Sequence, residues 1–140
     1  MGHVPAVSTI AAPPTVLAYI IEGSPVPAQM GAMIKGRDGT WITAKSSGRL
    51  REFKDRVRLL TSLRVRAARW ECGPDEMIAL TLRAFIEDAR VIDLDNICKS
   101  TIDCLKRVAF PDDRQVTELH ATKAIDRARP RLEIEIVRIS

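Results

Sequence analysis

Two carboxylates stand one residue apart in the stretch VIDLDNICKS, at Asp93 and Asp95, and a second acidic pair follows at Asp112 and Asp113. Four carboxylates that fold into one place repel one another unless protons or a hard divalent cation relieve the repulsion. Lys99 comes four residues after Asp95, so on a helix its ammonium shares a face with that acid. An ammonium there can neutralise an acid or meet a phosphate oxygen. The pattern therefore raises a choice between metal ligands and helix caps.

Capping accounts for part of the pattern without a metal ion. A helix is predicted to begin near Asp95 or Asn96, and the free amides and the dipole of a helix N-terminus favour a nearby carboxylate. One acid is enough for a cap, so capping leaves other carboxylates of the two pairs unexplained. The residues alone leave both interpretations open.

Composition limits the class of protein. A chain of 140 residues with 29% charged residues is typical of one soluble domain. Its three cysteines, Cys72, Cys98 and Cys104, have no CxxC or Cys/His spacing and predict reduced, mostly buried thiols rather than structural zinc. No apolar run approaches the ~20 residues of a membrane span, and the N-terminus lacks the features of a signal peptide. We therefore expect a cytoplasmic protein with no membrane contact.

Positive charge gathers in one segment of the chain. Of the 22 Lys and Arg residues, 11 lie between Lys35 and Arg69, beside only three acids. A basic stripe of this kind favours a polyanion such as nucleic acid, although a solvated helix face has the same composition. The residues expected to contact DNA are Lys45, Arg49, Arg51, Lys54 and Arg58.

Six main elements are predicted to position these residues. Hydrophobic periodicity and turn residues predict strands at 15–22, 77–86, 116–125 and 131–139, helices at about 46–70 and 96–109, and a short hairpin at 35–43. This order predicts an α/β (α+β) fold in which a single mixed β-sheet packs against two main helices, with strand 77–86 at its centre. Residues 1–14, which contain three prolines, are expected to form a flexible arm, and residues 15–140 a single domain.

Apolar residues at strand or helix spacing are expected to form the core. They are Ile78, Leu80, Leu82, Ala84 and Ile86 in the central strand, Leu50, Phe53, Val57, Leu60 and Ala67 in the first helix, Cys98, Ile102, Leu105 and Ala109 in the second, and Leu132, Ile134 and Ile136 in the last strand.

The order of elements makes the acidic pattern more specific. IDLDNICKSTIDCLKRVAFPDDRQV resembles the RusA family of Holliday junction resolvases, in which a DxDN motif opens a helix with a lysine on its first turn, and a DD pair follows ahead of a strand. GSPVP is similar to the family's Gly/Pro-rich motif, and WITAKSSGRLREFKDRVR to the stretch that leads into its basic helix. The resemblance covers about residues 15–139 and is strongest at 93–116.

The resemblance implies a Mg²⁺-dependent endodeoxyribonuclease that resolves four-way DNA junctions by paired symmetric nicks in recombination and repair, with Mn²⁺ as a substitute ion. It implies that Asp93, Asp95 and Asp113 are metal ligands, with Asp112 as a further candidate, and that Lys99 stabilises charge on the phosphate. Two symmetric cleavage points on branched DNA imply a homodimer.

Two other functions are weighed against this one. A non-catalytic DNA-binding or architectural module would keep the fold and use the acids only as caps. A phosphatase of the haloacid dehalogenase type is suggested by Ile92 before Asp93, but that class has its DxD at the end of an early strand, whereas DLDN comes late and opens a helix. His120 is expected to be a strand surface residue rather than a catalytic base, and His3 has no supporting motif.

A distance problem follows from these assignments. A helix from Asn96 to Ala109 is about 21 Å long at ~1.5 Å per residue, and residues 110–113 can return only ~13 Å at 3.3 Å per residue. Ligands of one ion need to lie closer than this. Either the helix is shorter, or Asp113 binds less directly, or the site is completed across a dimer, for which antiparallel packing of this helix on its two-fold mate is one arrangement.

Overall fold

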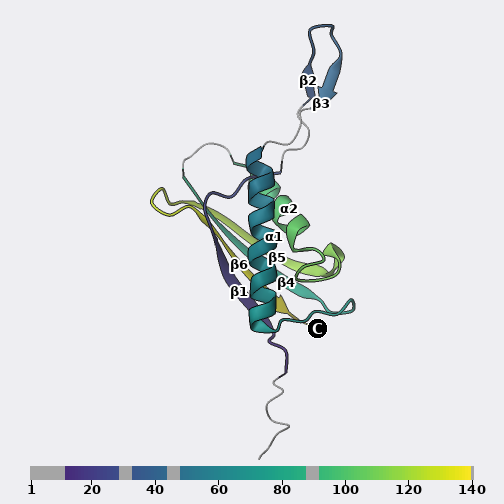
Figure 1. The fold of residues 1–140 in the computed structure, drawn as a ribbon, viewed down its shortest axis with the longest axis vertical. Helices are drawn as coiled ribbons and strands as arrows, with labels where there is room; N and C mark the ends of the chain where they lie inside the picture. Colours follow the sequence, from purple (N-terminus) through teal and green to yellow (C-terminus); the bar gives the residue numbers. More distant parts are fainter. Residues whose placement is uncertain (1–11, 29–32, 44–47, 88–91, 140) are drawn as a thin grey trace, which may run out of the picture.

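The computed structural model describes residues 12–28, 33–43, 48–87 and 92–139, and the structural statements below refer to these. In chain order the elements are β1 (Val16–Glu22), β2 (Met33–Lys35), β3 (Trp41–Thr43), α1 (Gly48–Ala68), β4 (Ile78–Ile86), α2 (Leu94–Leu105), the 3₁₀ helix η2 (Asp113–Gln115), β5 (Val116–Ile125) and β6 (Arg131–Arg138) (Figure 1).

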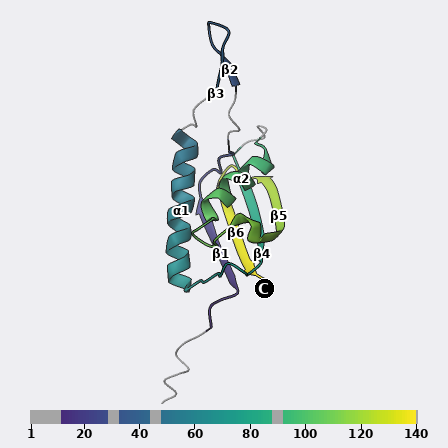
Figure 2. The same cartoon turned by 90° about the vertical axis from the view of Figure 1, so that its right-hand side faces the viewer.

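The main sheet has four strands in the order β1-β6-β4-β5. β5 runs parallel to β4, whereas β6 is antiparallel to both β4 and β1. Figure 2 shows α1 along the β1 side of this sheet and α2 in front of the remaining strands. The predicted mixed sheet with two helices is confirmed, and β4 is an inner strand as expected.

One face of the sheet forms the core because apolar residues alternate along each strand. The predicted core residues of β4 and β6 are all buried, and Leu17, Tyr19 and Ile21 of β1 join them. Both helices cover this face. The opposite face carries side chains such as Arg83, Glu133 and Glu135.

The buried face of α1 consists of Leu50, Phe53, Val57 and Thr61. Thr61 was not expected in the core, and its hydroxyl forms a 2.6 Å hydrogen bond with the Tyr19 hydroxyl, which satisfies two buried polar groups. The prediction that Ala67 is buried was wrong, because the last turn of α1 turns only Val65 toward the core and leaves Ala67 exposed. The helix ends where Arg69 adopts φ 53°. The proposed caps Ser46 and Ser47 lie outside the described residues.

The second helix is shorter than predicted. It begins at Leu94 and ends at Leu105 instead of Ala109. Arg107 adopts φ 69°, which turns the chain and places Ala109 and Phe110 in the core from a loop. The Ala109 carbonyl accepts a 2.7 Å hydrogen bond from Trp70 Nε1, so the residues after α2 are fixed against the end of α1. Periodicity alone could not reveal this, since Ala109 is buried in either conformation.

The predicted hairpin around Asp38 and Gly39 is confirmed, with Met33 opposite Thr43. The Asp38 carboxylate accepts hydrogen bonds from the backbone and the hydroxyl of Thr40, and Gly39 has φ 86°, a conformation that favours glycine. Of the expected arm, residues 1–11 lie outside the described residues. Pro13 and Pro14 accept hydrogen bonds from Arg138.

The loop after β1 joins the beginnings of both helices. Ser100 of α2 donates to the Val26 carbonyl at 2.9 Å, and the Ala28 amide donates to the Asn96 carbonyl at 2.9 Å. Arg49 and Phe53 of α1 line a small cavity together with Val26. The two helices therefore begin at the same end of the molecule. No helix in the described part of the chain is long and apolar enough to cross a bilayer.

Candidate active site

Asp93 and Asp95 lie at the N-terminus of α2. Asp93 is the N-cap: its Oδ1 accepts the Asp95 amide at 3.2 Å, and its Oδ2 accepts Nδ2 of Asn96 at 3.4 Å. Asp95 is in the first turn, where the helix dipole favours a negative charge. Both residues are exposed. The capping interpretation is therefore correct for Asp93, and both carboxylates remain accessible to a cation from solvent.

Lys99 is exposed one turn further along the same helix. The i,i+4 spacing places it on the face of Asp95. Three of the predicted site residues, Asp93, Asp95 and Lys99, are therefore grouped at the beginning of α2.

Lys123 is a second cation at this end of the molecule, and sequence reasoning does not identify it. Its Nζ donates a 2.8 Å hydrogen bond to the carbonyl of Ile92, the residue before the N-cap. The contact arises because β5 is parallel to β4, which sets Lys123 beside Ala84 near the end of both strands. Only the strand pairing, which periodicity does not specify, could have identified this lysine in advance.

Asp112 has a structural role at the other acidic pair. It is the N-cap of η2, where its Oδ1 accepts the Arg114 amide at 3.0 Å and its Oδ2 accepts the Arg114 guanidinium at 3.3 Å. The hydrogen bond from the Arg114 amide, followed by that from the Asp113 side chain, lowers the pKa of Asp112 to about 2. Asp113 is exposed. Of the two acids, Asp113 is thus the one less committed to holding the local fold.

Gln115 fixes the position of this acidic pair. Its Oε1 accepts the Asp112 amide at 2.9 Å, which completes a capping box. Its Nε2 donates to the carbonyls of Gly73 and Glu76, at 2.7 and 2.9 Å, in the segment that precedes β4. Asp113 is therefore held where β4 and β5 begin.

The two acidic groups lie at opposite ends of β5. Asp113 precedes Val116 at the start of the strand, whereas Asp93 is beside Lys123 near its end. Seven residue steps along a strand correspond to ~23 Å at 3.3 Å per residue. Among the described residues no group of three or more His, Cys, Asp or Glu side chains could hold a metal ion. The shorter α2 therefore does not bring Asp113 to Asp93 within one chain.

Basic residues of α1 lie beside this helix. Arg49, Arg51 and Arg58 are exposed, and Lys54 is half-buried. Burial raises the pKa of the Cys104 thiol, and the positive charges of Arg58 and Lys54 oppose that rise, which places both cations near the second half of α2. Two of the predicted basic residues of α1 therefore lie beside the second half of α2. Lys45 lies outside the described residues.

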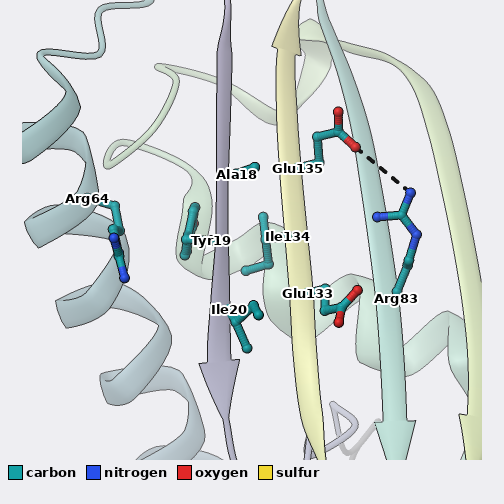
Figure 3. Close-up of a pocket in the computed structure, with 8 residues that line it drawn as sticks. All are labelled: Ala18, Tyr19, Ile20, Arg64, Arg83, Glu133, Ile134 and Glu135. Atoms are coloured by element: carbon teal, nitrogen blue, oxygen red, sulfur yellow. Dashed lines mark ion pairs between the residues drawn. The ribbon is translucent and has the colours of Figure 1, made fainter.

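A cavity of about 420 Å³ lies away from these acids, where α1 meets the β1 side of the sheet. It is lined by Ala18, Tyr19, Ile20, Arg64, Arg83, Glu133, Ile134 and Glu135, and Arg83 forms a 3.9 Å ion pair with Glu135 (Figure 3). Its two arginines are balanced by its two glutamates, so the cavity offers no net positive charge to a phosphate. This cavity is thus poorly suited to nucleic acid.

The remaining candidates have structural environments. Cys98 and Cys104 are buried and Cys72 is half-buried, and all three are free thiols, as predicted. His120 is exposed on β5, also as predicted. His3 lies outside the described residues. Cys98 lies one turn after Asp95 in α2, where burial, followed by the charge of Asp95, raises the pKa of its thiol.

Comparison with protein families gives the identity of this fold. A family model, Endodeoxyribonuclease RusA, matches residues 22–137. The chain belongs to the RusA endodeoxyribonuclease family. No curated protein matches the sequence. The match spans both acidic pairs, α1, β4, β5 and nearly all of β6, and it includes only the last residue of β1, so it covers most of the chain. Membership implies an endodeoxyribonuclease that acts on DNA, which agrees with the resemblance found in the sequence.

Proposed function

We propose that this RusA-family protein is a Mg²⁺-dependent endodeoxyribonuclease that cuts four-way DNA junctions by paired symmetric nicks in recombination and repair. The observation that carries the proposal is the pair of exposed carboxylates, Asp93 and Asp95, at the start of α2 in a chain of this family. Hydrolysis of a phosphodiester needs an activated water and shielding of the phosphate oxygens, and oxygen ligands of this kind suit a hard cation.

Asp93 and Asp95 supply two of the three carboxylates of the proposed magnesium site. Mg²⁺ is commonly held by one or two carboxylates together with water and substrate phosphate, and Mn²⁺ accepts the same oxygen ligands. When bound, the ion would orient and activate a water for attack and would neutralise charge on the phosphate. Asp113 is the third proposed ligand, whereas Asp112 is occupied as the cap of η2. Lys99 stabilises the charge that develops on the phosphate oxygens.

The separation of the acids within one chain supports a homodimer with shared active sites. Asp113 cannot reach Asp93 and Asp95 of its own chain, since they lie at opposite ends of β5. A two-fold related partner supplies Asp113 to the beginning of α2, and the same symmetry makes two equal sites. Two sites match the two symmetric cleavage points of a four-way junction.

The basic face of α1 is the proposed DNA surface. Lys54 and Arg58 lie near the second half of α2, and Arg49 lies beside Val26 in the loop that contacts this helix. Arg51 of α1 is exposed and joins them in the proposed surface. Lys45, which precedes this helix, belongs to the same proposed surface. Contacts of Lys and Arg with phosphate give an affinity for DNA that does not depend on the base sequence. Recognition of a branched shape requires contacts of this kind.

A non-catalytic DNA-binding module is the second candidate. It is favoured by one observation, that Asp93 and Asp112 both serve as helix caps. Under this alternative the acids stabilise the fold and the protein binds branched DNA without cutting it.

One assay separates the two candidates. The purified protein is incubated with a synthetic four-way junction and with a matched linear duplex, each with and without Mg²⁺. The proposal predicts symmetric paired nicks on the junction only when Mg²⁺ is present, and little cutting of the duplex. Binding of the junction with no nicks under any Mg²⁺ or Mn²⁺ concentration would assign the protein to the second candidate.

A further inference from the structure

Arg56 is a half-buried cation in the middle of α1, and the sequence did not single it out among the basic residues of this helix. Within the part of the chain that the structure describes, no hydrogen bond or ion pair uses its guanidinium, and its Nε is buried without an acceptor. A charge that is partly withdrawn from water and has no counter-charge is unfavourable. An anion that reaches the guanidinium therefore relieves an existing cost.

The loop after β1 holds this guanidinium in place. Gly23 has φ 101°, a conformation that favours glycine, and a Cβ there would lie 3.2 Å from Cζ and from both terminal nitrogens of Arg56. Because the three distances are equal, the guanidinium presents its flat face to the Gly23 backbone. Its Cζ also lies 5.9 Å from the centre of the Phe53 ring. These contacts use the face of the guanidinium and leave its N–H edge for a bidentate acceptor.

The same guanidinium lines a cavity of about 150 Å³ between α1 and this loop. Arg49, from the first turn of α1, is seven residues before Arg56 and shares its face of the helix. The other lining residues are Ser24, Val26, Glu52 and Phe53. Pockets that enclose an organic ligand measure roughly 300–1,000 Å³, so a small group such as a phosphate suits this cavity better than a nucleobase with its sugar.

Positive charge prevails in the cavity. Its two arginines face one carboxylate, that of Glu52, and no ion pair between described residues joins Glu52 to either arginine. A second carboxylate near the loop, Glu87, accepts the Ser24 hydroxyl at 2.7 Å and is thereby held by the loop itself. The cavity thus offers two guanidinium groups to an anion.

The cavity adjoins the beginning of α2. The Val26 carbonyl accepts the Ser100 hydroxyl at 2.9 Å, and the Ala28 amide donates to the carbonyl of Asn96, the residue after Asp95. A phosphate in the cavity is therefore bound at the same end of the molecule as the proposed metal ligands.

We propose that Arg56 and Arg49 bind a backbone phosphate of DNA in this cavity, with Gly23 supporting the guanidinium of Arg56. The proposal rests on the proposed function, because the ligand is a phosphodiester of the DNA substrate. Two oxygens of one phosphate accept hydrogen bonds from the edge of the Arg56 guanidinium, a geometry that arginine supplies and lysine does not.

Removal of the Arg56 charge tests the site. Arg56→Met keeps an apolar stem, and Arg66→Met, in the exposed last turn of α1, is the charge-matched control. Affinity for a four-way junction is measured by fluorescence anisotropy without metal over a range of salt concentrations. Arg56→Met should bind about tenfold more weakly, and its slope of log affinity against log salt concentration should become less steep by about 0.9, the value of one phosphate contact. Arg66→Met should change neither quantity. Equal effects of the two variants, or no effect of Arg56→Met, overturn the proposal.

Thermal stability separates phosphate binding from a purely structural role. If Arg56 served only to pack on Gly23 and Phe53, its replacement would lower the melting temperature and leave the affinity for DNA unchanged. We expect the opposite, because Arg56→Met removes a buried donor that has no acceptor. A lower melting temperature together with wild-type junction affinity contradicts the site.

Two milder variants decide the question if Arg56→Met does not fold. Arg56→Lys keeps the charge but loses the bidentate edge, so it should bind the junction a few times more weakly with an unchanged salt slope. Glu52→Gln removes the carboxylate from the cavity and should bind the junction a few times more tightly. Wild-type affinity in both variants would show that the cavity holds no phosphate.

Neutral phosphates identify the contact on the DNA. Junctions are prepared with a single methylphosphonate, which lacks the charged oxygen, at successive positions along one strand. One position should weaken binding of the wild-type protein but not of Arg56→Met, because this variant has already lost the contact. If every position weakens the two proteins equally, Arg56 contacts no single phosphate.

Inorganic phosphate distinguishes a DNA site from a site for a free anion. The amide signals of Gly23 and Ser24 are followed by NMR while inorganic phosphate or a short DNA duplex is added. Both ligands should shift these signals in the wild-type protein, the duplex at lower concentration because it makes further contacts, and neither should do so in Arg56→Met. A shift with inorganic phosphate alone would assign the cavity to a free anion and overturn the proposal.

These outcomes separate the phosphate site from the proposed function. If the wild-type protein cuts the junction and Arg56→Met binds it equally well, the site is wrong and the function stands. If Arg56→Met loses affinity as expected but the wild-type protein makes no nicks, the site is supported and the catalytic proposal fails.

Discussion

At the scale of single residues, the carboxylates of this protein combine a structural role with a proposed chemical one. Asp93 caps α2 while its carboxylate stays exposed, whereas Asp112 is held on two sides by Arg114. The DxDN and DD spacing allowed the acids to be predicted as a group of candidates. The family resemblance ranked Asp113 above Asp112, but the cap that Asp112 forms depends on the 3₁₀ turn and on Gln115, which the spacing does not reveal.

Replacing a proposed ligand should separate cleavage from binding. Asn is as good an N-cap as Asp, so Asp93→Asn keeps the start of α2 but removes a charged metal ligand. We expect Asp93→Asn and Asp113→Asn each to abolish junction cleavage in Mg²⁺. Junction affinity, measured by gel mobility shift without metal, should stay the same or increase, since repulsion of phosphate decreases. A parallel loss of binding in either variant would argue against the ligand assignment.

The cap formed by Asp112 predicts a pH dependence of stability. Its folded pKa of about 2 lies below the ordinary value of 3.8, so the ionised carboxylate stabilises the fold above that ordinary value, and the contribution is lost as the pH falls toward 2. Asp112→Ala should therefore have a lower melting temperature than wild type at pH 7, and the difference should shrink between pH 4 and pH 2.

Arg114→Ala is the matched variant, because it removes the guanidinium but keeps the backbone N–H donor to Asp112. Its melting temperature should fall less than that of Asp112→Ala. A pH-independent difference between Asp112→Ala and wild type would show that the cap does not act through its charge.

At the scale of elements, hydrophobic periodicity predicted well which helices and strands exist. It predicted their first and last residues less well. The four strands of the main sheet, α1 and the alternation of β4 agree with the expectations. The end of α2 was predicted four residues late, since Ala109 fits the apolar spacing of a helix but reaches the core through the turn at Arg107. Tertiary packing, represented by the bond from Trp70 to Ala109, decided this boundary.

The basic face of α1 gives a prediction at the same scale. Arg51→Ala combined with Lys54→Ala should weaken binding to junction and duplex alike. The slope of log affinity against log salt concentration should become less steep by about two, because each phosphate contact that is lost removes about 0.9 from the slope.

A charge-matched control for this pair is Arg83→Ala combined with Arg129→Ala. These two arginines pair with Glu135 and Glu22 and lie off the α1 face. The control should leave the salt slope unchanged. Equal slopes for wild type and the α1 double variant would show that DNA does not contact this face.

At the scale of the whole molecule, the topology explains why the site is incomplete in one chain. The parallel pairing of β4 with β5 sends Asp93 and Asp113 to opposite ends of the same strand. The sequence indicated the problem through the length of the predicted helix, and it left three solutions open. The helix is shorter than predicted, yet Asp113 still lies far from Asp93 in one chain. The two remaining solutions are a less direct role for Asp113 and a site completed across a dimer, and the choice between them depends on how two copies associate.

Mixing two inactive variants tests the shared site most directly. Asp93→Asn and Asp113→Asn subunits are mixed in equal amounts, allowed to exchange, and assayed on a four-way junction with Mg²⁺. If sites are shared, each heterodimer keeps one site with all its acids, because one chain still has Asp93 and the other still has Asp113. Half of the dimers are heterodimers, so about a quarter of the wild-type sites should return, as single nicks rather than paired ones. No cleavage from any mixture, although heterodimers form, would contradict the shared site.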